Sequence, residues 1–116
     1  MSYFIQRIKS YLASSSQAQE KISDLLIELR HRGLNFDVSL QEEDGQKFFY
    51  AESVDYPRGY ISATGQTMEE LEKELKDAIF SAFSVPSRYC NPDLIVFSPP
   101  LTQTANVNQK RVYATT

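Results

Sequence analysis

The chain changes its hydrophobic period near residue 35, from a helical pattern to a strand pattern. Before that point the apolar side chains recur every three or four residues. They are Phe4, Ile5, Ile8, Tyr11 and Leu12, and then Ile22, Leu25, Leu26 and Leu29. This predicts two helices on either side of the serine run at 14–16. Basic side chains followed by a glycine are typical of a helix C-terminus, so we expect the second helix to end at Gly33.

From Phe36 the apolar residues alternate with polar ones, which predicts a half-buried strand. The dipeptide Asp44-Gly45 then predicts a tight hairpin turn, because both residues tolerate a positive φ. An aromatic return strand over 47–54 and a short third strand over 60–64 complete the predicted antiparallel unit.

The clearest helix is predicted over 67–84. Thr67 and Glu70 form a capping-box pattern, in which the threonine hydroxyl and the glutamate satisfy free N–H groups of the first turn. Pro86 ends this segment, and the apolar run 94–97 predicts one more strand before a pair of prolines. Gly59 and Gly65 are expected to supply a positive φ or a bulge.

These elements predict an α+β fold in three parts. A helical extension occupies residues 1–35, a β-β-β-α-β sheet with one packed helix occupies 36–97, and a polar tail occupies 98–116. Within the tail, residues 111–114 could form an edge strand, either of their own sheet or exchanged with a neighbouring copy.

One helix covers only one face of such a sheet. The return strand nevertheless carries apolar side chains on both faces, with Phe48, Tyr50 and Val54 on one and Phe49 and Ala51 on the other. The second face therefore needs a cover, which the N-terminal helices or another subunit could supply. We predict a homodimer or a larger homo-oligomer formed through sheet edges or the uncovered face.

Composition and charge restrict the function. The 116 residues suffice for one ordinary domain, and the net charge is −3. Residues 36–97 carry five basic against twelve acidic side chains, a balance of −7. Such a domain repels a phosphate backbone and attracts a basic partner, so nucleic acid is not the expected ligand. No signal peptide and no apolar run of about 20 residues is visible, so we expect a cytoplasmic protein without a membrane span.

The middle of the chain resembles the HicB-like antitoxin family. The resemblance is carried by the strand end Phe49–Pro57, with its aromatic-x-Ala-x-x-x-Asp-x-Pro order, by Gly59 and Gly65, and by the helix start Thr67–Leu71. It implies a partial ribonuclease-H-like sheet over about residues 36–97. It also implies a non-enzymatic role, commonly the binding of a small RNA-cleaving toxin of the HicA type. The DNA-binding segment that many members carry after this domain has no counterpart in the tail pattern.

Catalysis has little support in the residues. Cys90 and His31 are single residues of their types in separate segments. Asp37, Glu70 and Asp93 are the only carboxylates that could form a two-metal nuclease site. Asp37 lies between two buried neighbours, so its side chain should point away from the helix. We therefore predict no enzyme, no cofactor and no metal.

The predicted function is a non-catalytic protein-binding module, a HicB-like antitoxin or solo relative, that binds a basic protein partner such as a small toxin-like protein. Glu42, Glu43 and Asp44 would steer the encounter, and Tyr50 and Tyr60 would contact the partner. The alternative is a structural or assembly adaptor whose N-terminal helices carry the interaction.

Overall fold

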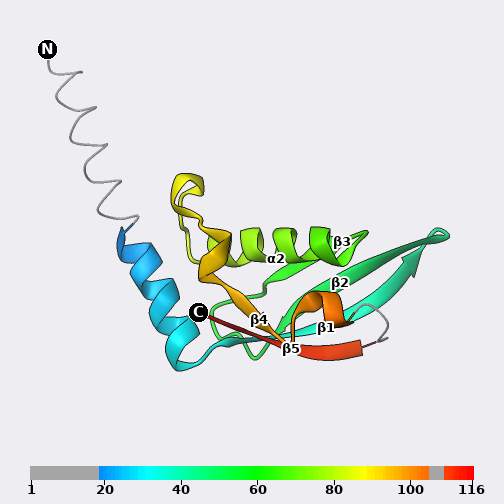
Figure 1. The fold of residues 1–116 in the computed structure, drawn as a ribbon, viewed down its shortest axis with the longest axis horizontal. Helices are drawn as coiled ribbons and strands as arrows, with labels where there is room; N and C mark the ends of the chain where they lie inside the picture. The colour runs from blue at the N-terminus through cyan, green and yellow to red at the C-terminus, as the bar shows by residue number, and fades with distance from the viewer. Residues whose placement is uncertain (1–18, 105–108) are drawn as a thin grey trace, which may run out of the picture.

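A computed structural model describes residues 19–104 and 109–116 of the chain. Its described part is an α+β structure, in which five antiparallel strands form one sheet in the order β3-β2-β1-β5-β4. Helix α2 lies over one face of this sheet (Figure 1). In chain order the elements are β1 (Leu34–Glu43), β2 (Gln46–Val54), β3 (Ser62–Gly65), α2 (Met68–Ala82), the 3-10 turns η1 (Ser87–Tyr89) and η2 (Pro92–Leu94), β4 (Val96–Ser98), η3 (Leu101–Thr104) and β5 (Gln109–Thr115).

The hairpin between β1 and β2 forms at the predicted place. Glu43 pairs with Gln46, and the two residues between them, Asp44 and Gly45, have φ values of 51° and 79°. Two positive φ angles twist the turn in the sense that matches the twist of the strands. Side chains then alternate between the two faces, so that Phe36, directly across from Val112, is buried in the hydrophobic core.

Helix α2 begins with half of the expected capping box. The Glu70 N–H donates to Thr67 Oγ1 at 3.1 Å, as predicted. The Glu70 carboxylate, however, accepts from the N–H of Gln66, one residue before the cap, at 3.2 Å. The helix ends at Ala82, two residues earlier than predicted, where Ser84 takes a φ of 60°.

Gly65 has a different role from the one predicted. Its φ is not in the left-handed region, whereas that of Gly59 is 150°. A Cβ at Gly65 would lie only 2.4 Å from the backbone nitrogen of Leu71. The glycine is therefore needed because the first turn of α2 passes directly over the end of β3.

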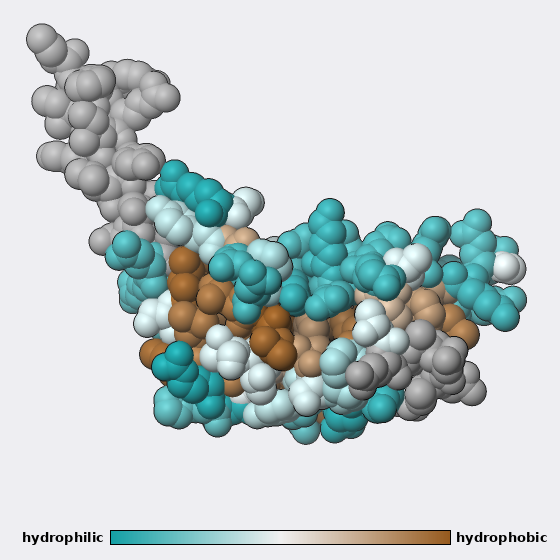
Figure 2. Space-filling view, viewed as in Figure 1, coloured by the Kyte–Doolittle hydropathy of each residue, from teal (hydrophilic) through white to brown (hydrophobic). Residues whose placement is uncertain are grey.

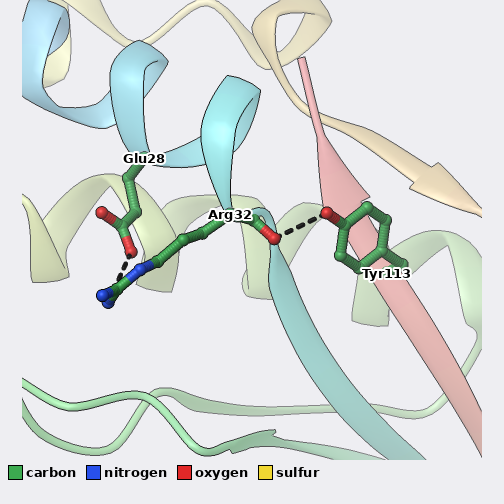
Figure 3. Close-up of polar contacts among 3 residues, drawn as sticks. All are labelled: Glu28, Arg32 and Tyr113. Atoms are coloured by element: carbon green, nitrogen blue, oxygen red, sulfur yellow. Dashed lines mark hydrogen bonds and ion pairs between the residues drawn. The ribbon is translucent and has the colours of Figure 1, made fainter.

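Residues 19–31 are helical, and this helix ends at Gly33 as predicted. The N–H groups of Arg32 and Gly33 both donate to the Glu28 carbonyl. The Tyr113 hydroxyl donates to the Arg32 carbonyl at 2.6 Å and ties the helix end to β5 (Figure 3). The helix predicted before residue 13 lies outside the described residues.

The described N-terminal helix packs within its own chain. Leu25 and Leu29 are buried in the hydrophobic core, and every strand residue of that core faces α2. This helix therefore covers the same side of the sheet as α2. Figure 2 shows the result as a row of apolar residues beneath the hydrophilic upper rim, where Figure 1 places α2.

The expectation of an edge strand in the tail is wrong. Strand β5 lies inside the sheet, paired with β1 over Leu34–Ser39 and with β4 over Val96–Ser98. Val112 and Ala114 are fully buried in the hydrophobic core. The segment is polar overall, but its alternation places its few apolar side chains on one face, where tertiary partners bury them.

The sheet consequently differs from the expected β-β-β-α-β arrangement. The order of the first three strands, the helix and β4 agrees with the prediction, but β5 separates β4 from β1. Strand β4 begins at Val96, later than predicted, although Ile95 is buried. Residues from all three predicted parts of the chain thus contribute to one core. None of the described helices combines the length and the apolar character that crossing a membrane requires.

Candidate protein-binding surface

One face of the sheet has no helical cover from the described residues, and we call it the open face (Figure 1). The strand register assigns its side chains. On β1 they are Asn35, Asp37, Ser39, Gln41 and Glu43, and on β2 they are Gln46, Phe48, Tyr50, Glu52 and Val54. On the other three strands they are Ser62 and Thr64 of β3, Arg111 and Tyr113 of β5, and Val96 and Ser98 of β4. The surface combines carboxylates with partly exposed aromatic rings.

Tyr50, Glu52 and Tyr60 converge on the open face and form what we call the tyrosine–glutamate cluster. Tyr50 and Glu52 are two residues apart on β2 and so share a face. Tyr60 comes from the loop before β3 and donates its hydroxyl to Glu52 Oε2 at 2.5 Å. The Tyr50 hydroxyl reaches the same oxygen at 3.2 Å and also hydrogen-bonds the Tyr60 hydroxyl.

Tyr60 stays a hydrogen-bond donor although 61% of it is exposed. The hydrogen bond to Glu52, followed by the one to Tyr50, raises the pKa of Tyr60 far above its ordinary value. The phenol is therefore protonated at neutral pH, and the cluster carries the single negative charge of Glu52.

A second carboxylate lies directly across from the cluster. Asp37 is the β1 partner of Glu52 on the open face, and like charges in that position destabilise a sheet. Arg111 of β5 compensates Asp37 through an ion pair of 2.6 Å. Among the described residues Glu52 has no such ion pair and is held by neutral phenols.

The hairpin extends beyond the other strands and forms an arm over residues 40–48 (Figure 1). Strand β5 pairs with β1 only as far as Ser39, and β3 pairs with β2 only from Phe49. Glu42, Glu43 and Asp44 are all exposed at the end of this arm.

The five predicted contact residues therefore fall into two groups. Tyr50 and Tyr60 meet at the cluster, while the three acids lie at the tip of the arm. Four residues of β2 lie between Gly45 of the turn and Tyr50, so the two are roughly 17 Å apart at the rise of an extended strand. Glu43 faces the open side, whereas Glu42 faces the other side of the sheet and Asp44 lies in the turn.

The residues considered for catalysis lie apart. Asp37 points away from α2, as predicted, and so away from Glu70. Burial, and secondarily the charge of Asp77, raises the pKa of the Cys90 thiol, which donates to the Pro86 carbonyl at 3.3 Å. Within the described ranges, no three histidine, cysteine, aspartate or glutamate side chains are placed to share a metal ion.

A cavity of about 260 Å³ opens where the N-terminal helix meets the loop after β2. Its wall includes Asn35, Asp55 and Tyr56 together with Glu28 and Arg32, which form an ion pair of 3.8 Å (Figure 3). This volume is below the roughly 300–1,000 Å³ of ordinary small-molecule sites.

Comparison of the chain with protein-family profiles, curated proteins and solved structures finds no match. The resemblance to HicB-like antitoxins therefore rests on the residues named above.

Sequence reasoning missed Glu52 and Arg111 as members of this surface. The Tyr50-x-Glu52 spacing was a usable signal, because residues two apart in a strand share a face. The Asp37–Arg111 pair had no such signal, since it joins residues 74 positions apart through the register of β5.

Proposed function

We propose that this chain is a non-catalytic protein-binding module that engages a basic protein through its open face and its hairpin arm. The observation that carries the proposal is the open face itself. It lacks helical cover from the described residues, and it presents Asp37, Glu43 and Glu52 beside partly exposed aromatic rings.

Charge supports the choice of a basic partner. Residues 36–97 have a balance of −7, and the arm places three acids on a projecting tip. Complementary charge raises the rate of encounter and disfavours acidic competitors, while exposed aromatic rings supply contact area.

The resemblance to HicB-like antitoxins makes the proposal more specific. On that basis the partner is a small, basic, toxin-like protein, and the chain is an antitoxin or a solo relative of one. The residues that carry the resemblance lie in β2, the following loop and the start of α2, and of these segments β2 and the loop place Tyr50, Glu52 and Tyr60 on the open face.

Charge reversal at the arm tests the proposal. The arm variant is E42K/E43K/D44N, in which asparagine preserves the positive φ of residue 44. Its control, E69K/E74K/D77N, makes the same change in charge on exposed positions of α2. Each full-length protein is used to capture partners from the native host, and the captured protein is then purified and titrated.

We expect wild type and the α2 control to retain the same basic protein, and the arm variant to bind it at least about tenfold more weakly. Equal affinity of all three proteins, or capture of no basic protein at low salt, would contradict the proposal.

The adaptor alternative is favoured by Ile27, which is 54% exposed on the helix 19–31. A deletion through residue 33 would not test it, because it also removes Leu25 and Leu29 from the core. Ile27→Lys together with a deletion of residues 1–18 retains Leu25 and Leu29. Under the main proposal these changes leave capture of the basic protein intact, whereas an adaptor loses its partner.

A further inference from the structure

We propose that the tyrosine–glutamate cluster is a receptor for one arginine side chain of the partner. The inference rests on the proposed function, because it names the anchor through which a basic protein binds the open face. The guanidinium group would pair with the Glu52 carboxylate and lie against the ring of Tyr60.

The cluster is already ordered before any partner binds. Two hydroxyls from different segments, Tyr50 on β2 and Tyr60 in the loop, meet on one oxygen of Glu52. A half-buried glutamate and an exposed tyrosine would otherwise sample several rotamers, and their ordering costs free energy on binding. Because hydrogen bonds already order these side chains, ligand binding loses less conformational entropy.

The carboxylate of Glu52 has no cationic partner among the described residues. Arg111, which lies on the open face, already forms an ion pair of 2.6 Å with Asp37. Glu52 lies across from Asp37 and is held by neutral donors within the described part of the chain. A cation brought by a partner would neutralise Glu52 and relieve the repulsion between the two facing carboxylates.

The cluster is not needed to anchor the loop that carries Tyr60. The next residue, Ile61, is buried, and its backbone is fixed to Ser53 by two hydrogen bonds of 2.8 and 2.9 Å. With the loop end held there, the hydrogen bonds of the exposed Tyr60 side chain are available for recognition.

The geometry favours arginine over lysine. A guanidinium group is planar, pairs with a carboxylate through two N–H donors and stacks on aromatic rings. Tyr60 provides an exposed ring next to the carboxylate, so one arginine can form the ion pair and the cation–π contact together.

The test uses the full chain and the peptide acetyl-Gly-Arg-Gly-amide, with the citrulline peptide as its neutral isostere. Binding is followed by NMR through the ring signals of Tyr50 and Tyr60. We expect the arginine peptide to shift these signals saturably and the citrulline peptide to leave them unchanged. Equal shifts with both peptides, or no shift with either, would overturn the inference.

Variants then locate the site. Glu52→Gln retains the hydrogen-bond acceptor but removes the charge, and it should weaken binding of the arginine peptide at least about fivefold. The control Glu69→Gln removes one charge from exposed α2 and should change binding less than about twofold. Tyr60→Phe, which keeps the ring, should bind more tightly than Tyr60→Ala. Wild-type affinity in Glu52→Gln would rule the receptor out, and circular dichroism checks that each variant folds.

The two proposals can fail separately. If Glu52→Gln captures the basic protein as wild type does while the arm variant loses it, the arginine receptor is wrong and the proposed function stands. If neither variant affects capture of any basic protein, the proposed function is wrong. The peptide titration still decides whether the cluster binds arginine.

Discussion

At Gly65 the backbone of α2 and the end of β3 come so close that no side chain fits between them. A Cβ would lie 2.4 Å from the Leu71 nitrogen and 2.8 Å from its Cα, and these backbone atoms cannot move without displacing the helix. Gly65→Ala should therefore lower the free energy of unfolding by about 3 kcal/mol, at the upper end of overpacking effects.

Gly45→Ala is the matched control, because it makes the same change where the space is empty. Only the φ of 79° opposes it, at a cost of about 1 kcal/mol. Urea denaturation of both variants measures the difference. A loss at Gly65 no larger than the loss at Gly45 would mean that α2 can shift away without penalty.

Ser84 occupies a position that usually belongs to glycine. It follows the C-cap of α2 with a φ of 60°, while the N–H of Val85 closes the helix end on the Phe80 carbonyl. Ser84→Gly should raise the free energy of unfolding by about 0.5–1 kcal/mol. Glycine relieves the backbone strain of the positive φ, and this gain exceeds the loss from the greater flexibility of glycine in the unfolded chain.

The same substitution three residues earlier should have the opposite sign. Ser81 lies within α2, where glycine is a poorer helix former, so Ser81→Gly should cost about 0.5 kcal/mol. Thermal unfolding followed by circular dichroism resolves the two signs, and a destabilising Ser84→Gly would contradict the strain argument.

Among the elements, β5 shows most clearly that a polar segment can be structural. Val112 is fully buried between β1 and β4, while its neighbour Arg111 is exposed on the open face in an ion pair with Asp37. Val112→Asn should lower the free energy of unfolding by at least about 3 kcal/mol, because it leaves a cavity and an unpaired amide in the core.

Arg111→Asn, on the same strand, should cost less than about 1 kcal/mol, since exposed ion pairs contribute little to stability. Chemical denaturation distinguishes the two positions. Similar, small effects at both would indicate that this segment behaves as the tail that its composition predicts and not as an interior strand.

For the whole molecule the two sheet edges differ. Strand β4 is followed at once by Pro99 and Pro100, which hinder pairing with another strand. The edge strand β3 contains neither charge nor proline. Ser53 pairs with Ile61 through a backbone hydrogen bond, so the alternation of an antiparallel ladder turns the backbone groups of Ser62 and Thr64 outward.

We therefore expect a homodimer formed by antiparallel pairing of two β3 strands. Lysines on an edge strand oppose such pairing, so S62K/T64K should be monomeric in analytical ultracentrifugation. The control S98K/T102K places one lysine at the exposed end of β4 and one at an exposed position of η3, and it should remain dimeric. A wild-type monomer at all concentrations would show that the β3 edge does not associate.

The local pattern by itself determined the hairpin, α2 and the end of the N-terminal helix. In each case neighbouring residues carry the signal: Asp44-Gly45 satisfies the backbone of a tight turn, Thr67 caps a helix, and Gly33 ends one. The two-residue period of β1 likewise gave the orientation of Asp37 correctly.

Only the tertiary structure decided the place of β5, the reason for Gly65 and the assembly of the open face. Each depends on residues far apart in the chain, as in the pairing of Asp37 with Arg111 or the passage of α2 over β3. A short alternating segment can form an edge strand, an interior strand or a tail with nearly the same local pattern. Its place is decided by the partners that bury one of its faces, because that burial supplies the free energy that orders it.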